Sequence, residues 1–300
     1  MTDLKTEGTI PFTLGGETYQ TWYKLVGDLS STRPPLVVLH GGPGLCHDYL
    51  ISIGDLAQRA PSTAVLFYDQ IGGARSTHLP SKPRVFWTLD VFIAELENVL
   101  AHFKIADAYD LLGHSWGAVL ATEFVVRHQP KGLKHLVLAS GFPSSQIRAE
   151  ERRKLLLKLP EDVRTAILKH EAEDTTKEKT CRDAMQVFYA TFGCTLNPPP
   201  QELIYSFSQG EDESGGVVVF DNVMKNFLEK DWDITDRLHL IHMPTLITNG
   251  ENDFMTDGIQ YPLFRGIEKV KWAKFAKSGH IPHFEERERY MDVLSSFLEL

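Results

Sequence analysis

Short apolar runs alternate with helix-like segments through the first 140 residues of the chain. Four runs have the length and composition of buried strands, at residues 36–39, 64–68, 109–112 and 136–139. Residues 89–103 place apolar side chains at helical spacing, and residues 118–128 also fit a helix. Short buried strands that alternate with helices predict an α/β fold, in which a mostly parallel sheet has helices on both faces.

The pattern changes after Ser140. Residues 146–168 are charged and helical in character, and the strongly polar residues 171–179 are expected to form a turn. Three consecutive prolines at residues 198–200 break the chain. We therefore expect a mostly helical insertion in this part of the sequence.

The alternation of strand and helix returns near the end of the chain. Residues 244–248 and 270–276 have the composition of strands, and residues 284–300 fit a closing helix. The predicted organisation is one core, interrupted by a helical cap. The core comprises residues 1–140 and 236–300, and the cap comprises residues 141–235.

Composition and charge narrow the function classes. The 300 residues suffice for one large domain with an insertion, and 42% hydrophobic with 24% charged residues exclude disordered and fibrous proteins. The formal net charge of -9 disfavours nucleic acid and anionic membranes as partners, because both bind basic surfaces. We expect neither partner, and the sequence leaves open whether the chain is a monomer or a homo-oligomer.

The N-terminal residues and the cysteines bear on the compartment. Residues 1–11 lack the basic patch and apolar run of a signal peptide, and no apolar stretch approaches the ~18 residues of a membrane span. Cys46, Cys181 and Cys194 form an odd set without metal-ligand spacing. We therefore expect a cytoplasmic protein with neither a disulfide framework nor a metal.

A candidate nucleophile lies in the segment Gly-His-Ser-Trp-Gly at residues 113–117. The segment follows a predicted strand and precedes a predicted helix, which is the context of a nucleophile elbow. The turn is so tight that the residues flanking the serine must be small, and Gly113 and Gly117 meet that need. Ser115 is therefore predicted to stand above the sheet edge as the nucleophile.

A second glycine-rich turn, His-Gly-Gly-Pro-Gly at residues 40–44, follows the first predicted strand. Acyl transfer needs backbone N–H groups that stabilise the oxyanion. One comes from the residue after the nucleophile, Trp116, and one from an earlier loop. The proline of this turn has no N–H to donate. Gly41, Gly42 and Gly44 remain as candidates, and we favour Gly42.

Asp253 and His280 complete a candidate triad. Each follows a predicted strand in the last part of the chain, and the order Ser, Asp, His is that of an α/β-hydrolase. His280 would take the Ser115 proton and return it to the leaving group, while Asp253 fixes the imidazole tautomer. Nearby alternatives are Glu251 and Asp257 for the acid and His283 for the base. The remaining histidines of the motifs, His40 and His114, are interpreted as loop-positioning residues.

These motifs resemble the proline iminopeptidase family of α/β-hydrolases, which includes the archaeal tricorn-interacting aminopeptidase. The resemblance rests on residues 40–44, 47–50, 67–76, 113–117, 231–235, 244–253 and 279–280. It thus covers nearly the whole chain except the middle of the insertion. Residues 69–76 are Asp-Gln-Ile-Gly-Gly-Ala-Arg-Ser, where the family usually has Asp-Gln-Arg-Gly-x-Gly-Arg-Ser.

The resemblance has implications for the fold and for the site. It implies an α/β-hydrolase core with a helical cap and without a cofactor. It implies Ser115, Asp253 and His280 as the triad. It also implies Gly42 and Trp116 as the oxyanion donors.

The sequence departs from the family where the substrate's free amine is bound. Family aminopeptidases hold this amine with glutamates, one of them in a cap motif resembling Gly-Pro-Ser/Asn-Glu-Phe, and Asn222 stands at that glutamate's position. Phe254 stands where the archaeal relative has a second glutamate, directly after the triad aspartate. A buried ammonium needs a carboxylate partner, so these changes favour an uncharged substrate. Asp221, or residues 211–213, remain as substitutes in a rearranged cap.

Aromatic residues, with Trp116 among them, are expected to make the pocket apolar. The predicted substrate-binding residues are Gly41, Phe142, Phe220, Asn222 and Phe254. We expect a serine hydrolase that forms an acyl-enzyme with a small ester, lactone or amide. The alternative within enzymes is a proline iminopeptidase that releases N-terminal proline or other residues from peptides. The alternative from another class is a non-catalytic receptor for a small ligand.

Overall fold

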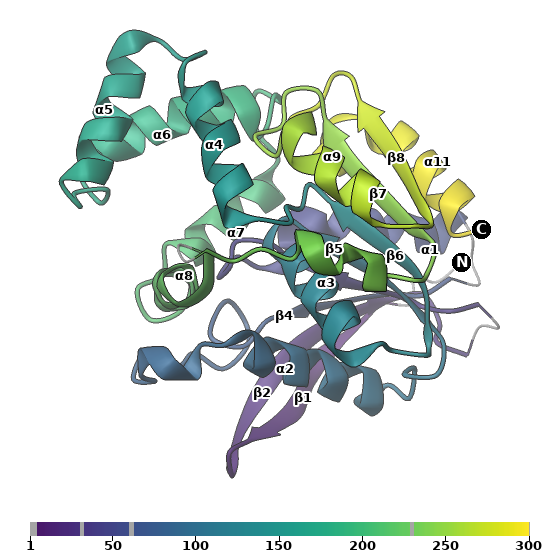
Figure 1. The fold of residues 1–300 in the computed structure, drawn as a ribbon. Coiled ribbons are helices and arrows are strands. Elements are labelled where there is room, and N and C mark those ends of the chain that lie inside the picture. The colour runs from purple at the N-terminus through teal and green to yellow at the C-terminus, as the bar shows by residue number, and fades with distance from the viewer. Residues whose placement is uncertain (1–4, 31–32, 60–62, 229–230, 300) are drawn as a thin grey trace.

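An eight-stranded sheet forms the centre of the computed structural model, which describes residues 5–30, 33–59, 63–228 and 231–299 (Figure 1). The strands are β1 (Lys5–Leu14), β2 (Glu17–Val26), β3 (Leu36–Leu39), β4 (Val65–Asp69), β5 (Tyr109–His114), β6 (Leu133–Ala139), β7 (Thr245–Gly250) and β8 (Val270–Phe275). Their order is β1-β2-β4-β3-β5-β6-β7-β8. β1 and β4 each pair antiparallel with β2, and the other pairs are parallel. The predicted α/β class with a mostly parallel sheet is confirmed.

The first two strands form a hairpin that the continuous apolar runs do not reveal. β1 buries only alternate residues near its end, Ile10 and Phe12 among them. The turn to β2 contains Gly15 and Gly16, whose φ values of 60° and 83° suit glycine. A strand with one face toward water alternates apolar and polar residues, so a search for unbroken apolar runs misses it.

Helices outside the insertion cover both faces of the sheet. They are η1 (His47–Asp55), α1 (Leu56–Arg59), η2 (Arg84–Phe86), α2 (Leu89–His102), α3 (Trp116–His128), η4 (Thr235–Leu240), α9 (Asp257–Gly266), α10 (Pro282–Glu285) and α11 (Arg287–Phe297). Apolar residues of α2, α3 and α9 pack with one set of strand residues, and those of η1, α1 and α11 with the alternate set. The expected single closing helix is wrong: it divides at Glu286, whose backbone is not helical (φ -125°, ψ 49°).

The segment between β6 and β7 is helical. It contains α4 (Ser145–Leu156), α5 (Glu161–Ala172), α6 (Lys179–Phe192), α7 (Gln201–Gly210), α8 (Gly216–Val223) and the π-helix η3 (Met224–Leu228). α5 and α6 project away from the sheet (Figure 1). The helix-like residues 146–168 form two helices, because Pro160 precedes α5 and cannot continue α4. The proposed division into core and cap stays a prediction.

The inserted helices have a small apolar cluster of their own. Its buried members are Leu155, Leu156, Leu159, Ile167, Ala184, Phe188 and Phe192. Half-buried Phe254, in the loop after β7, packs both against this cluster and against the larger cluster on the sheet. That side chain is therefore a point of contact between the inserted helices and the sheet.

Candidate active site

Ser115 lies in the turn between β5 and α3. Its backbone has φ 55° and ψ -116°, and its N–H donates to the Ala139 carbonyl at 2.8 Å. Close packing requires the flanking glycines. A Cβ at Gly113 would lie 2.2 Å from the Gly117 carbonyl oxygen, and a Cβ at Gly117 would lie 2.2 Å from the Leu39 oxygen. A positive φ at a residue with a side chain is strained, and such strain recurs at functional sites.

The Asp253 carboxylate and the His280 imidazole form a buried pair. Asp253 Oδ1 lies 2.8 Å from His280 Nδ1 and also accepts the Met255 N–H at 2.8 Å. Asp253 exposes 1% of its surface and His280 exposes 8%, so little water reaches the contact. Because this oxygen also accepts the Met255 N–H, it acts as an acceptor, and the proton of the contact lies on His280 Nδ1.

Two glutamates support the loop that carries His280. Glu285 Oε2 accepts the N–H groups of Gly279 and Ile281 at 2.9 and 3.3 Å. Glu286 accepts two further hydrogen bonds, at 2.9 and 2.8 Å, from the preceding part of the same loop. Sequence reasoning missed both residues, because acidic side chains near the start of a helix ordinarily complement its dipole.

Ser115 and His280 lie on adjacent loops. The imidazole rings of His114 and His280 are 4.6 Å apart, and His114 Nε2 lies 2.8 Å from the His280 carbonyl oxygen. Within the described residues, no hydrogen bond joins the Ser115 hydroxyl to the His280 ring. Catalytic hydrogen bonds are often long in the absence of substrate and tighten when it binds.

The glycine-rich turn after β3 reaches Ser115. A Cβ at Gly41 would lie 2.9 Å from the Ser115 Cβ. The Gly41 N–H donates to the Tyr49 hydroxyl at 2.7 Å, so it is already engaged. Gly44 packs against Gly216 of α8, whose carbonyl oxygen would lie 2.4 Å from an added Cβ. These contacts favour Gly42, whose φ is 115°, and its role as oxyanion donor stays a prediction.

Trp116 is the first residue of α3, where a backbone N–H has no partner within the helix. Its indole Nε1 donates to Gln70 Oε1 at 3.0 Å. The Gln70 side chain donates to the His40 carbonyl at 2.8 Å, and the Gln70 N–H donates to His40 Nε2 at 2.9 Å. Buried Gln70 thus joins both predicted oxyanion segments. The family motif contained this glutamine but did not reveal its contacts.

The alternative acids and base have other partners. Glu251 and Asp257 both pair with Lys274, at 2.6 and 2.7 Å. His283 Nε2 donates to the Tyr49 carbonyl at 2.8 Å, and burial lowers the pKa of His283 to about 3. These contacts favour the buried acid–base pair described above.

Phe254 stacks on the candidate base. The rings of Phe254 and His280 lie 3.9 Å apart with an interplanar angle of 29°. On the inserted helices, the rings of Phe188 and Tyr189 lie 5.9 and 6.1 Å from Phe254. A cavity of about 80 Å³ opens here, and its lining residues are Arg148, Arg152, Met185, Phe188, Tyr189, Phe254 and Met255. Phe254 is the predicted substrate residue that reaches this cavity.

Three further predicted substrate-binding residues, Phe142, Phe220 and Asn222, have different surroundings. Phe142 is buried and packs edge-on against Trp232, with ring centroids 5.6 Å apart. Phe220 is 44% exposed. Asn222 Nδ2 donates to the Val218 carbonyl at 2.8 Å within α8. None of the three lines the cavity beside Phe254.

The charged residues that line this cavity are arginines. Its lining holds Arg148 and Arg152 and, among the described residues, no carboxylate. Arg152 also pairs with Glu171. Asp221, one of the expected substitutes for the missing glutamate, pairs with Lys177 at 3.9 Å and does not line the cavity. Residues 211–213 do not line it either.

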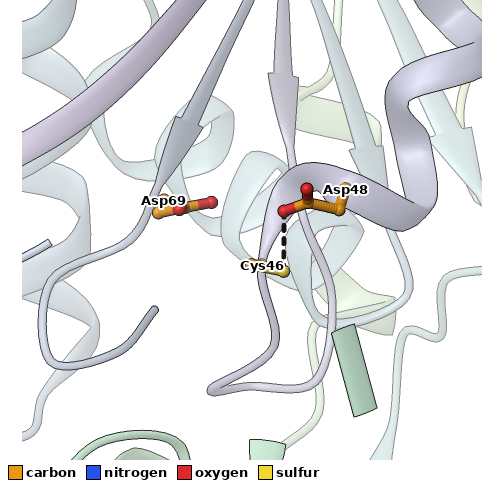
Figure 2. A group of neighbouring side chains, drawn as sticks. All are labelled: Cys46, Asp48 and Asp69. Atoms are coloured by element: carbon orange, nitrogen blue, oxygen red, sulfur yellow. Dashed lines mark hydrogen bonds between the residues drawn. The ribbon is translucent and has the colours of Figure 1, made fainter. Parts of the chain in front are cut away.

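One cluster has residue types that bind metal ions, but the Arg75 guanidinium lies against its two carboxylates. Cys46, Asp48 and Asp69 lie close together beside β4, and the thiol donates to Asp48 at 3.0 Å (Figure 2). Arg75 Nη1 contacts Asp48 at 2.7 Å and Asp69 at 3.2 Å. Burial raises the pKa of the Cys46 thiol, which disfavours the thiolate that a metal needs. The guanidinium and the neutral thiol do not fit a bound metal ion.

Among the described helices, none combines the length and the apolar character that crossing a bilayer requires.

The chain is similar in sequence and in fold to several known proteins. Residues 34–287 match the model of the alpha/beta hydrolase fold family. A proline iminopeptidase of Saccharolobus solfataricus is 33% identical over 280 residues, which cover 93% of this chain and 88% of that protein. The crystal structure of VinJ is 35% identical with a TM-score of 0.90, covering 98% of both chains. That of a proline iminopeptidase from Mycobacterium smegmatis is 32% identical with a TM-score of 0.85, covering 97% of this chain and 98% of that one.

Proposed function

This chain belongs to the proline iminopeptidase family of α/β-hydrolases, and we propose that its Ser115, His280 and Asp253 act as a catalytic triad on an uncharged acyl substrate. The chain is a hydrolase enzyme. The residues that perform the reaction and the substrate are inferred from the contacts described above.

The proposed reaction proceeds through an acyl-enzyme. The Ser115 oxygen attacks the substrate carbonyl carbon while His280 Nε2 takes the hydroxyl proton. The carbonyl oxygen becomes an oxyanion that accepts the N–H groups of Gly42 and Trp116. The carbon–leaving-group bond then breaks, and His280 gives its proton to the leaving group. Water, activated by the same imidazole, releases the acid and restores the serine. Asp253 fixes the tautomer and stabilises the imidazolium.

The Phe254 ring on His280 is the observation that carries the substrate assignment. It presents an apolar face beside the base, and the cavity behind it is lined by two arginines and aromatic rings. A substrate ammonium there would lose its hydration and find no carboxylate among the described residues of the lining. A small ester, lactone or amide without a free amine avoids that penalty. The Gly41 N–H already donates to the Tyr49 hydroxyl, so Gly41 would contact the substrate only through its other main-chain atoms.

The relatives favour a second candidate, a proline iminopeptidase that acts on short peptides. Such an enzyme would need a carboxylate for the free amine, and Asn222 and Phe254 stand at the two glutamate positions. Among described residues, the candidate substitutes lie outside the cavity lining. The third candidate, a non-catalytic receptor, has no need for a buried Asp253–His280 pair.

The compartment is also inferred. Cys46, Cys181 and Cys194 are buried and form no disulfide, which is typical of a reducing environment. We propose a cytoplasmic enzyme of small molecules or short peptides that binds neither nucleic acid nor membranes.

The test is hydrolysis of two chromogenic panels, neutral acyl esters and aminoacyl anilides that include the proline derivative. The proposal predicts ester cleavage, little cleavage of anilides with a free amine, and loss of activity in Ser115→Ala. Rapid proline anilide cleavage that is lost in Ser115→Ala would establish the second candidate. Failure of a fluorophosphonate probe to label the folded wild-type protein would favour the receptor.

A further inference from the structure

A buried chain of hydrogen bonds joins the three loops that the proposed reaction uses. The Gly41 N–H donates to the Tyr49 hydroxyl at 2.7 Å. The Tyr49 hydroxyl lies 2.8 Å from His114 Nδ1, and His114 Nε2 lies 2.8 Å from the His280 carbonyl oxygen. Tyr49 exposes 2% of its surface and His114 exposes 1%. These hydrogen bonds thus connect the turn after β3, the end of β5 and the loop after β8.

The chemistry of the partners fixes the direction of each hydrogen bond. A carbonyl oxygen only accepts, so His114 Nε2 must carry a proton and donate to His280. Burial, followed by the charges of His280 and His283, lowers the pKa of His114 well below its usual value, so the ring is neutral. Its Nδ1 is then an acceptor, and the Tyr49 hydroxyl donates to it while accepting the Gly41 N–H. The Tyr49 O–H and both ring nitrogens of His114 therefore each have a hydrogen-bond partner.

The same tyrosine is held from a second side. The Tyr49 carbonyl accepts His283 Nε2 at 2.8 Å, and the Tyr49 N–H donates to the Ser206 hydroxyl of α7 at 3.1 Å. A Cβ at Gly41 would lie only 2.7 Å from the Tyr49 hydroxyl, so the close approach of this hydroxyl requires glycine at position 41. The tyrosine is therefore fixed before substrate binds.

We propose that Tyr49 and His114 are positioning residues that hold the oxyanion turn and the His280 loop at a fixed distance on either side of Ser115. Gly41 directly precedes the proposed donor Gly42, and His114 directly precedes the nucleophile. The Tyr49 and His114 side chains bind main-chain groups of the two loops, Gly41 N–H and the His280 carbonyl. The inference rests on the proposed function, because it assigns the residues a role in acyl transfer.

The test compares two tyrosines with matched chemistry. Tyr49→Phe removes a buried hydroxyl that belongs to this series of hydrogen bonds. Tyr290→Phe removes a buried hydroxyl that does not belong to it and whose partner is the Thr248 hydroxyl at 3.3 Å. We expect kcat to fall ~10–100-fold in Tyr49→Phe with KM changed less than about threefold, because displaced donors act mainly in the transition state. Tyr290→Phe should lose thermal stability to a similar degree and keep its kcat.

A second pair keeps the inference testable if Tyr49→Phe does not fold. In His114→Gln the amide can accept from Tyr49 and donate to the His280 carbonyl, whereas His114→Leu can do neither. We expect kcat and the rate of fluorophosphonate labelling to rank wild type, His114→Gln, His114→Leu. A role in stability alone would lower the melting temperature of both without this ranking.

The outcomes separate the inference from the proposed function. A folded Tyr49→Phe with wild-type kcat, or an equal loss of kcat in Tyr290→Phe, would overturn the inference and leave the triad assignment intact. A wild-type protein that hydrolyses its substrate without labelling at Ser115 would overturn the proposed function and, with it, this inference.

Discussion

The loops around Ser115 and the inserted helices differ in how their side chains are held. Around Ser115, buried polar groups have defined partners: Gln70 binds His40 and Trp116, and Tyr49 binds His114. On the inserted helices, large apolar side chains face solvent, among them Leu157, Tyr189, Ile204, Phe207 and Phe220. The first region fixes donors and acceptors to within hydrogen-bond lengths, whereas the second offers an apolar surface with few such constraints.

In the proposed mechanism, reaction chemistry and substrate choice therefore depend on separate parts of the molecule. Hydrogen bonds with fixed directions preorganise the catalytic groups. Exposed apolar side chains bind by area and shape, so they can change without moving those groups. The two regions meet at Phe254, which packs against both apolar clusters and stacks on His280. The following predictions separate the two regions, in order of decreasing expected effect.

The largest effect is expected from Asp253→Asn, on the catalytic side of the comparison. An amide would favour the wrong tautomer of His280, and kcat should fall ~10⁴-fold with little change in folding. Steady-state kinetics and thermal melting measure the two quantities. The matched control is Asp257→Asn, since Asp257 pairs with Lys274. Comparable losses of kcat in both variants would show that the acid has been misassigned.

Ile167→Ala tests whether the inserted helices can be loosened independently. Ile167 is fully buried in their apolar cluster, so the truncation should cost about 2–4 kcal/mol. Hydrogen exchange should rise in α5 and α6 while fluorophosphonate labelling continues. In the matched variant Ile247→Ala, on β7, labelling should decline together with the fold. Loss of labelling in Ile167→Ala at temperatures where the sheet stays folded would contradict the separation.

Glu95→Gln tests a buried carboxyl on the sheet side. Glu95 accepts the Ile71 N–H at 2.9 Å and bonds with the Thr21 hydroxyl, and burial raises its pKa from 4.5 to about 8. Between these values the unfolded chain has lost a proton that the folded protein keeps, so wild-type stability falls as pH rises. From pH 5 to pH 8, Glu95→Gln should gain on the order of 3 kcal/mol relative to wild type in denaturant unfolding. A difference independent of pH would refute the neutral carboxyl.

The smallest effect is expected at Phe254, where the two regions meet. Phe254→Leu removes the stacked ring, and kcat/KM for bulky apolar esters should fall ~10-fold, with a smaller change for acetyl esters. Phe264→Leu is the control, because Phe264 is a partly exposed aromatic that packs on Trp272. Equal losses across all ester sizes would place Phe254 in support of His280 and not in substrate choice.

The sequence pointed to the candidate triad but not to the residues that support its loops. The elbow glycines could be identified because Gly113 and Gly117 admit no Cβ, a constraint that local sequence must satisfy. Tyr49 and Glu285 could not, because an isolated tyrosine or glutamate is compatible with many surroundings, and their partners are distant in the chain. Phe142 packs on Trp232, and its place beside the substrate stays a prediction.

The central claim is that Ser115 forms the acyl-enzyme, and mass spectrometry of the protein treated with a fluorophosphonate tests it most directly. The account predicts one adduct, on the peptide that contains Ser115, formed rapidly in wild type and much more slowly in Asp253→Asn. An adduct on another residue, or hydrolysis that persists in Ser115→Ala, would contradict the account.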